Sequence, residues 1–170
     1  MRGSPKRRVS AAAGAPITSS SPAESMTFGC TTLVLRGAGA KIDGIVFQNM
    51  RVPDGNGAGI RLEKSDLEIV NSLFRNSEEG ILTANDPAAT LTIDRSTFSR
   101  LGLCDRGLSC AHSVYTGLYG RVVVTHTRFE KGTGGHYLKT RAKQVEVSDN
   151  SFNDTGSYIV RSLGRDSVQS

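Results

Sequence analysis

The chain reads AKIDGIVF at residues 40–47, and the same eight-residue pattern returns further along. The later copies are LEIVNSLF at 67–74, LTIDRSTF at 91–98, VVVTHTRF at 122–129 and VEVSDNSF at 145–152. Every copy ends in phenylalanine and carries apolar residues seven and five positions before it. Because side chains of an extended strand alternate between its two faces, this spacing predicts a half-buried β-strand.

The copies also share polar residues at fixed positions around the phenylalanine. The residue two positions before it is Ser72, Ser96, Thr127 or Asn150 in the last four copies. Side chains of these types bond to neighbouring backbone groups in turns. Asn49 and Asn76 stand two positions after a phenylalanine and also predict turns.

The repeat length favours a stack of similar units. Successive phenylalanines are separated by 27, 24, 31 and 23 residues, and a unit of this length cannot bury its own apolar face. A second extended segment lies between the phrases, as GIRLEKS from Gly59, GILTAND from Gly80, SVYTGLYG from Ser113, HYLKTRAK from His136 and SYIVRSLG from Ser157. No helical period intervenes, which argues against βαβ units and leucine-rich horseshoes. The sequence therefore predicts two or three short strands per coil, wound into parallel sheets.

Over about residues 33–168 these phrases resemble the right-handed parallel β-helix family, the pectate-lyase-like superfold. HYLKTRA at 136–142 is also similar to a phrase in uncharacterised bacterial members of that family. The resemblance implies an all-β solenoid over residues 31–168, a right-handed single-stranded parallel β-helix with about one coil for each of the five phrases. It also implies an extracellular or periplasmic location. It leaves function open, because the superfold hosts polysaccharide lyases, hydrolases, epimerases, phage tailspikes and adhesins.

Residues 1–30 are expected to form a disordered basic tail rich in Ser, Pro and Ala. This stretch lacks the continuous apolar core of a signal peptide. No apolar run approaches the roughly 18 residues that a membrane span requires, so no span is expected. Because a further strand begins at Val168 and neither end carries a capping pattern, we expect the chain to be a truncated gene product or a segment of a larger protein.

The net charge of +5 is unevenly distributed. Residues 1–40 hold five basic residues and one acid, whereas residues 41–170 hold sixteen and fifteen. Within the second part, residues 121–143 carry six bases and a single acid, Glu130. This cluster favours an anionic ligand. Nucleic acid is not expected as the partner, because the chain has neither a named binding module nor a basic stripe interleaved with aromatics.

A candidate site follows from aligning the second segments as strands. Ile60, Ile81, Val114, Leu138 and Ile159 are expected to point inward, which turns Arg61, Leu82, Tyr115, Lys139 and Val160 outward in one column. Arg141 lies two residues beyond Lys139, His136 stands at the preceding turn, and Arg121, Arg128 and Lys143 belong to the same two coils. We therefore hypothesise a functional patch of Lys139, Arg141, Tyr115 and His136.

Such a patch suits β-elimination from a uronic-acid polymer. Arg is a fitting partner for the uronate carboxylate, Lys a base for the C5 proton, and Tyr or His an acid for the leaving oxygen. The resemblance implies similar roles for Lys139 and Arg141, because polysaccharide lyases of this superfold use Lys and Arg on outward strand faces. The Asp cluster of calcium-dependent pectate lyases has no match here. We expect a protein that binds or processes an acidic polysaccharide and, if it is an enzyme, a polysaccharide lyase.

Several alternatives stay open. The chain is otherwise a non-catalytic structural or glycan-binding solenoid, or an inactive fragment, in which KTR at 139–141 is a solvated face paired with acidic coils. Glycoside hydrolysis would need two carboxylates about 5 to 9 Å apart. The acids considered for it, most of them in expected turns, are Glu63, Asp66, Glu78, Glu79, Asp86, Asp105 and Asp154.

No metal site and no cofactor are predicted. His112 and His126 lie in different segments without the spacing of metal ligands, and single histidines are more often structural. Cys104 and Cys110 in CDRGLSC either close a small disulfide or remain unpaired. With Cys30 the cysteines are three in number, so they define no disulfide framework and no compartment.

Overall fold

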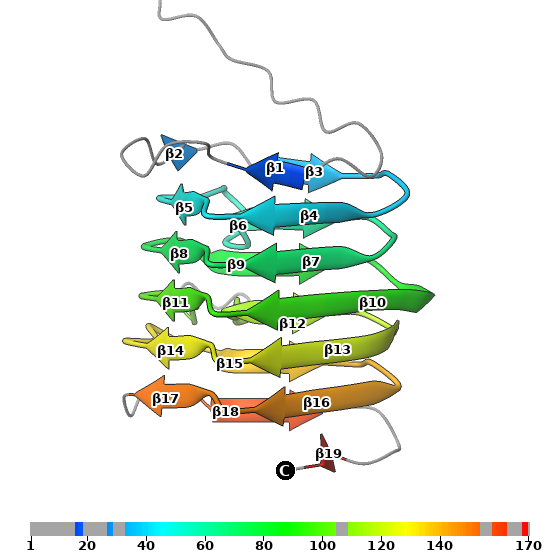
Figure 1. Ribbon diagram of the computed structural model, residues 1–170. Helices are drawn as coiled ribbons and strands as arrows, with labels where there is room; N and C mark the ends of the chain where they lie inside the picture. The colour runs from blue at the N-terminus through cyan, green and yellow to red at the C-terminus, as the bar shows by residue number, and fades with distance from the viewer. Residues whose placement is uncertain are drawn as a thin grey trace, which may run out of the picture.

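The computed structural model describes residues 33–104 and 109–153, together with the strand backbones of residues 16–18, 27–28, 158–162 and 168–169. These residues form a stack of coils, and successive coils lie one above another (Figure 1). Each strand pairs in parallel with the equivalent strand of the neighbouring coil. The expectation of an all-β parallel solenoid is confirmed.

The strands form three parallel sheets. Sheet A contains β1 (Pro16–Thr18), β4 (Ala40–Asp43), β7 (Leu67–Val70), β10 (Asp86–Asp94), β13 (Tyr119–Thr125), β16 (Gln144–Ser148) and β19 (Val168–Gln169). Sheet B contains β2 (Thr27–Phe28), β5 (Val46–Gln48), β8 (Leu73–Arg75), β11 (Thr97–Ser99), β14 (Arg128–Glu130) and β17 (Ser151–Asn153). Sheet C contains β3 (Leu33–Leu35), β6 (Ala58–Leu62), β9 (Glu79–Thr83), β12 (Val114–Thr116), β15 (His136–Thr140) and β18 (Tyr158–Ser162).

Two of these strands fall within residues 1–30, where a disordered tail is expected. β1 pairs with β4, and β2 pairs with β5. The remaining residues of that range lie outside the described part of the chain.

Each repeated phrase contains a sheet A strand, a corner and a sheet B strand. The corner residue has a left-handed backbone in successive coils, with φ of 51° at Asn71, 46° at Arg95, 47° at His126 and 56° at Asp149. A second left-handed residue follows the sheet B strands β5, β8, β11 and β14, with φ of 60° at Asn49 and 52° at Asn76. Asparagine tolerates this conformation better than most residues do. The turns expected at Asn49 and Asn76 are therefore confirmed.

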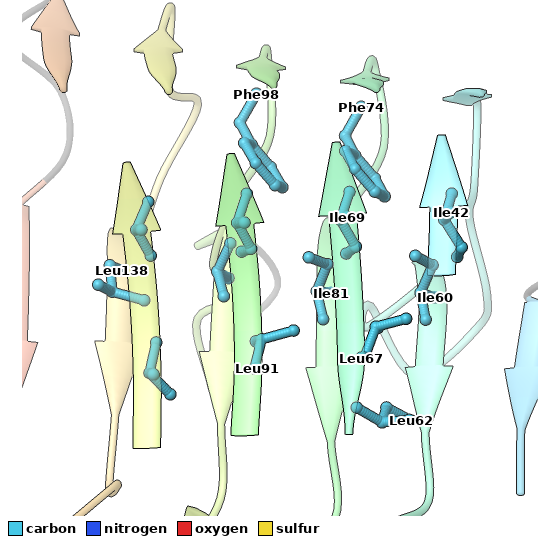
Figure 2. Close-up of a cluster of buried hydrophobic side chains, with 14 of the residues drawn as sticks. Ile42, Ile60, Leu62, Leu67, Ile69, Phe74, Ile81, Leu91, Phe98 and Leu138 are labelled. Atoms are coloured by element: carbon cyan, nitrogen blue, oxygen red, sulfur yellow. The ribbon is translucent and has the colours of Figure 1, made fainter. Parts of the chain in front are cut away.

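The repeated phenylalanines form one stack inside the solenoid. The Phe47, Phe74, Phe98 and Phe129 rings follow one another with centroids 4.7, 4.7 and 5.0 Å apart, and Phe152 continues the stack at 5.1 Å. These spacings match the separation of about 4.8 Å between neighbouring parallel strands. Aliphatic columns that include Ile42, Ile69 and Leu91 fill the rest of the interior (Figure 2).

Sheet C departs from simple alternation, and this departure shapes its outer face. Ile60, Ile81, Val114 and Leu138 point inward as expected and are buried. The residue before them also faces the interior in three coils. A Cβ on Gly59 would lie 2.9 Å from Phe47 Cβ, one on Gly80 would lie 2.9 Å from the Phe98 ring, and the Tyr137 ring packs 5.7 Å from Phe129. Where two successive residues of a strand face the interior, the residue that precedes them faces outward.

The last coil has a different register from the one expected. Leu138 pairs with Val160 and Lys139 pairs with Arg161, so Val160 takes the position that was assigned to Ile159. The expected alignment of Lys139 with Val160 is therefore wrong by one residue. The outward column of sheet C runs through Val34, Arg61, Leu82, Tyr115 and Lys139, and the backbone of Arg161 is in register with Lys139.

Candidate functional site

The outer face of sheet C brings Tyr115 and Lys139 together, as the sequence predicts. The two residues are register partners in β12 and β15. Lys139 Nζ lies 5.0 Å from the centroid of the Tyr115 ring, within the range of a cation–π contact. Both side chains are half-buried, so each keeps a surface toward solvent.

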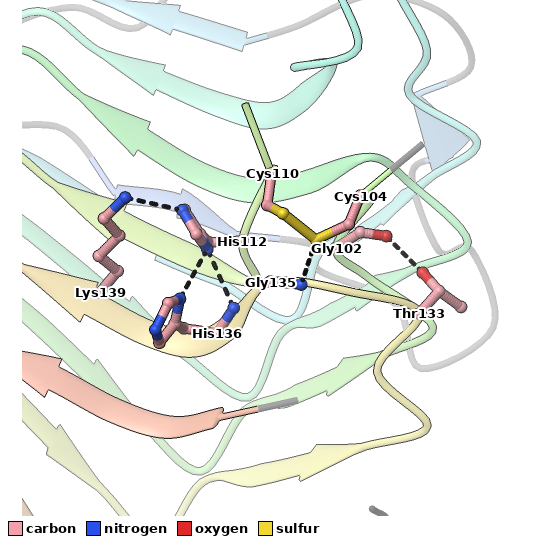
Figure 3. Close-up of a disulfide and its surroundings, with 8 residues drawn as sticks. All are labelled: Gly102, Cys104, Cys110, His112, Thr133, Gly135, His136 and Lys139. Atoms are coloured by element: carbon pink, nitrogen blue, oxygen red, sulfur yellow. Dashed lines mark hydrogen bonds between the residues drawn. A yellow bond between two sulfur atoms is a disulfide. The ribbon is translucent and has the colours of Figure 1, made fainter. Parts of the chain in front are cut away.

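His112 is the centre of this cluster, although sequence reasoning assigned it a structural role. Its Nε2 atom lies 3.2 Å from Lys139 Nζ (Figure 3). Its ring also meets the Tyr115 ring edge-on, with the centroids 5.6 Å apart. His112 is only 3% exposed, so its ring is largely withdrawn from water. We name the set Glu79, Tyr115, His112, His136 and Lys139 the His112 cluster.

His136 orients the His112 ring. The backbone N–H of His136 donates to Nδ1 of His112 at 2.9 Å, and the two Nδ1 atoms lie 3.3 Å apart. Because a backbone N–H can only donate, His112 Nδ1 carries a lone pair, and the proton of the neutral ring belongs to Nε2. Burial lowers the pKa of His112 to about 4, with further lowering by Lys139 and His136, so the ring is neutral at pH 7.

Glu79 lies beside His112 with its carboxyl group buried. It begins β9, is 2% exposed, and accepts a hydrogen bond from the His112 backbone N–H. Burial raises the pKa of Glu79 to about 8, and the His112 N–H, Arg61 and Lys139 partly offset that rise. The carboxyl group is therefore mostly protonated at pH 7, which makes it a proton donor next to the cluster.

Arg141 stands further along the same segment. It follows β15 and is exposed, and its backbone N–H donates to Thr116 O at 3.1 Å. Among the described residues the Arg141 side chain forms no hydrogen bond, ion pair or ring contact with the His112 cluster. The structure therefore does not bring Arg141 into the cluster, although Arg141 is exposed and follows the same strand.

The basic residues of the 121–143 segment do not form a single patch. Arg121 of β13 lies on sheet A, where it pairs with Glu146 at 2.7 Å. Arg128 of β14 lies on sheet B and pairs with Glu130 at 2.8 Å. The three sheets face different directions, so neither Arg121 nor Arg128 joins Lys139. Lys143 is exposed in the connection from β15 to β16.

A shallow hollow of about 300 Å³ lies on the same face, toward the first coils. Its lining residues are Val34, Val52, Asn56, Ala58, Arg61, Glu63 and Leu82. Glu78 holds the loop at its edge, because one of its carboxylate oxygens accepts from the backbone N–H groups of Val52 and Gly57 at 2.9 and 2.8 Å. These bonds give Glu78 a structural role in the loop between Val52 and Gly57.

Two residues of the His112 cluster, Glu79 and His112, were not predicted from the sequence. Glu79 was counted among acids of turns, and His112 was judged to be a structural histidine. Both stand two positions before an inward residue, Ile81 or Val114, as His136 does before Leu138. This shared position was a usable signal, but strict alternation would have turned all three side chains inward.

Cys104 and Cys110 are joined by a disulfide (Figure 3). The loop between them is described only at its ends, and Asp105 lies outside the described residues, as does Asp154. Across residues 33–104 and 109–153, no group of three or more His, Cys, Asp or Glu side chains is arranged to hold a metal ion. The same part of the chain contains no helix long and apolar enough to cross a membrane.

Comparison with known proteins identifies a family. A family model described as right handed beta helix region matches residues 31–167. No curated protein and no solved structure matches the chain.

Proposed function

We propose that this chain, which belongs to the right-handed β-helix family, binds an acidic polysaccharide on the outer face of sheet C and cleaves it by β-elimination. The observation that carries the proposal is the 3.2 Å contact of Lys139 Nζ with His112 Nε2, beside the Tyr115 ring. Family membership alone does not select a chemistry. The proposal therefore depends on what these side chains can do.

The cationic groups of this face account for recognition of a uronate. Arg141 is exposed and lies two residues beyond Lys139, about 6.6 Å along an extended chain. A guanidinium binds a carboxylate through two parallel hydrogen bonds, which would hold one sugar ring with its C5–H toward the cluster. This contact also withdraws charge from the carboxylate, so that the C5 proton becomes more acidic.

Lys139 is the base of the proposed reaction. His112 Nδ1 already accepts from the His136 backbone, so Nε2–H is the donor that faces Lys139 Nζ. In the proposed reaction Lys139, in its neutral amine form, would take the C5 proton of a bound uronate with its lone pair. The electrons of the C5–H bond then form a C4–C5 double bond. The C4–O bond breaks, and its electron pair stays on the leaving oxygen.

Tyr115 is the proposed acid for that leaving oxygen. It is the register partner of Lys139 in the neighbouring coil, and its ring centroid lies 5.0 Å from Lys139 Nζ. A phenol is an adequate general acid when it is held within hydrogen-bond reach of the oxygen. The products are a sugar with a free hydroxyl and a 4,5-unsaturated uronate, so the reaction needs no water and no metal redox step.

The test is the ultraviolet absorbance of unsaturated uronates, with alginate, pectate and glycosaminoglycans offered to the purified chain. We expect absorbance to rise with one of these polymers, and Lys139→Met to lower the rate by about a hundredfold or more, the usual contribution of a general base. Arg121→Met is the matched control, because Arg121 is a basic residue on sheet A paired with Glu146. It should keep the wild-type rate.

Absence of absorbance with every polymer would reject the lyase. Binding of a polymer without product, weakened by Lys139→Met, would assign the chain to the second candidate, a glycan-binding solenoid. The cation–π contact of Lys139 with Tyr115 favours that candidate, because it presents a positive charge at a fixed place without requiring chemistry.

We also propose an extracellular or periplasmic location. The Cys104–Cys110 disulfide supports this, because disulfides persist in oxidising compartments and are rare in the cytosol. Blocking free thiols in freshly lysed cells, followed by reduction and labelling, tests the pairing. Free Cys104 and Cys110 at the moment of lysis would contradict it.

A further inference from the structure

We infer that the Cys104–Cys110 disulfide positions His112 against His136, and that its reduction by a dithiol displaces the His112 ring from Lys139. The inference rests on the proposed function only for the role of Lys139 in catalysis. The positioning of His112 by the disulfide is inferred from contacts of Cys104 and Ala111 with the residues that precede β15.

The first connection runs along the chain from Cys110. His112 follows Cys110 by two residues, and Ala111 between them forms an antiparallel bridge with Leu103. The Ala111 N–H donates to Leu103 O at 2.8 Å, and the Leu103 N–H donates to Ala111 O at 3.4 Å. The disulfide joins the residue after Leu103 to the residue before Ala111, so it restrains the segment that carries His112.

The second connection comes from β15. The Gly135 N–H donates to Cys104 Sγ at 3.0 Å, and the next N–H, that of His136, donates to His112 Nδ1 at 2.9 Å (Figure 3). Two successive backbone donors thus bind the disulfide and the imidazole. A shift of Cys104 Sγ would alter the peptide group that orients the His112 ring.

Close packing transmits such a shift. A Cβ on Gly135 would lie 2.0 Å from Ala111 O and 2.7 Å from His112 Nδ1, and one on Gly134 would lie 2.9 Å from Cys104 N. Thr133 Oγ1 also donates to Gly102 O, next to the start of the loop. Gly134 and Gly135 therefore pack directly against Cys104 and Ala111, so a displacement at either end of the loop is passed to the residues before β15.

The redox step is balanced by the dithiol. Its two sulfurs are oxidised to a disulfide, while Cys104 and Cys110 each gain a hydrogen and become thiols. The two sulfurs then repel each other to ordinary contact distance, because no bond holds them. Cys104 Sγ can no longer remain where it accepts from Gly135 without moving Cys110.

The experiment compares imidazole nitrogen shifts in the full chain, oxidised and after reduction, by NMR of ring-labelled histidine. The oxidised protein should show His112 with its proton on Nε2. Reduction should shift the His112 and His136 signals. His126 is the internal control, because it is 59% exposed and bonded to Asp94 at 3.0 Å, in the corner between sheets A and B.

Unchanged His112 signals after reduction would overturn the inference. A change at His126 as well would also overturn it, because that result means a general loss of the fold and not a local displacement. The Cys104→Ser/Cys110→Ser double variant gives a second reading without a reductant, and its His112 and His136 signals should match those of the reduced protein.

Enzyme kinetics distinguish the proposed lyase function from the positioning role of the disulfide. In a polymer assay the double variant should show kcat lowered by about a hundredfold, the effect of a misplacement of roughly 1 Å, with KM unchanged. Altered His112 shifts in a protein without lyase activity would reject the proposed function and retain the positioning role. Unaltered His112 shifts in an active lyase would retain the proposed function and reject the positioning role.

Discussion

Ser96 Oγ accepts a hydrogen bond from the backbone N–H of Ser72 at 3.1 Å, one coil away. The same hydroxyl donates to Asp94 O at 3.0 Å. Thr127 and Asn150 repeat this arrangement in the next coils, where they accept from the N–H groups of Ser96 and Thr127 at 3.4 and 2.8 Å. The ladder satisfies backbone donors that would otherwise be buried without a partner.

Ser96→Ala removes one rung of this ladder. The buried Ser72 N–H then loses its acceptor, and we expect the free energy of unfolding to fall by about 1 to 3 kcal/mol. Urea denaturation measures the change. Ser151→Ala is the control, because Ser151 is exposed and its effect should stay within about 0.5 kcal/mol. Equal effects of the two substitutions would contradict a structural role for the ladder.

Phe98→Ala interrupts the aromatic stack. Phe98 lies between Phe74 and Phe129, with centroid distances of 4.7 and 5.0 Å, and is fully buried. We expect a loss of about 3 to 5 kcal/mol, from lost apolar burial together with the cavity left behind. Thermal unfolding gives the readout, and Leu118→Ala, at a 42% exposed apolar residue, should change little. A loss below that of Leu118→Ala would show that the coils do not depend on the stack.

Gly80→Ala should destabilise the solenoid. The added Cβ would lie 2.5 Å from Ser113 O and 2.9 Å from the Phe98 ring, so the neighbouring coil must shift. Overpacking of this kind costs about 1 to 3 kcal/mol. Gly37→Ala is the matched control, since its Cβ would meet no atom within 4 Å. Chemical denaturation measures the stability of both variants. Similar midpoints would contradict the close approach of the coils at Gly80.

Glu79 predicts a specific pH dependence of stability. Its pKa is 4.5 in an unperturbed chain and rises to about 8 on folding, so the folded state keeps a proton that the unfolded chain releases. Its contribution to stability is complete below pH 4.5 and is lost as the pH rises through about 8. The free energy of unfolding should therefore fall by up to about 1.4 kcal/mol per pH unit in this window.

Glu79→Gln should flatten this dependence, because the amide does not titrate. Urea denaturation at about pH 5 and about pH 9 measures the difference between wild type and variant. Glu146→Gln, which alters an exposed carboxylate paired with Arg121, should keep the wild-type slope. The prediction fails if the free energies of unfolding of wild type and Glu79→Gln fall equally between about pH 5 and about pH 9.

Much of the candidate site was predictable, because outward residues of neighbouring coils share one column. Tyr115 and Lys139 meet as the alignment of their segments indicates. Arg121 and Arg128 do not join them, because one coil turns through three sheets and nearness in sequence does not keep side chains on one face. Glu79 and His112 were not predicted, because an acid in an expected turn and a single histidine without ligand spacing are usually structural.

The repeated phrase is enough to specify the coil and its contents. Each coil packs mainly against its neighbours, so a local phrase of two apolar positions, a polar turn residue and a phenylalanine specifies the stack, the ladder and the corners. Three features follow only from the folded chain: the paired inward residues of sheet C, the Arg161 register with Lys139 and the contact of Cys104 with Gly135. These depend on how connections of unequal length pack against the next coil, and a repeat period carries no information about that packing.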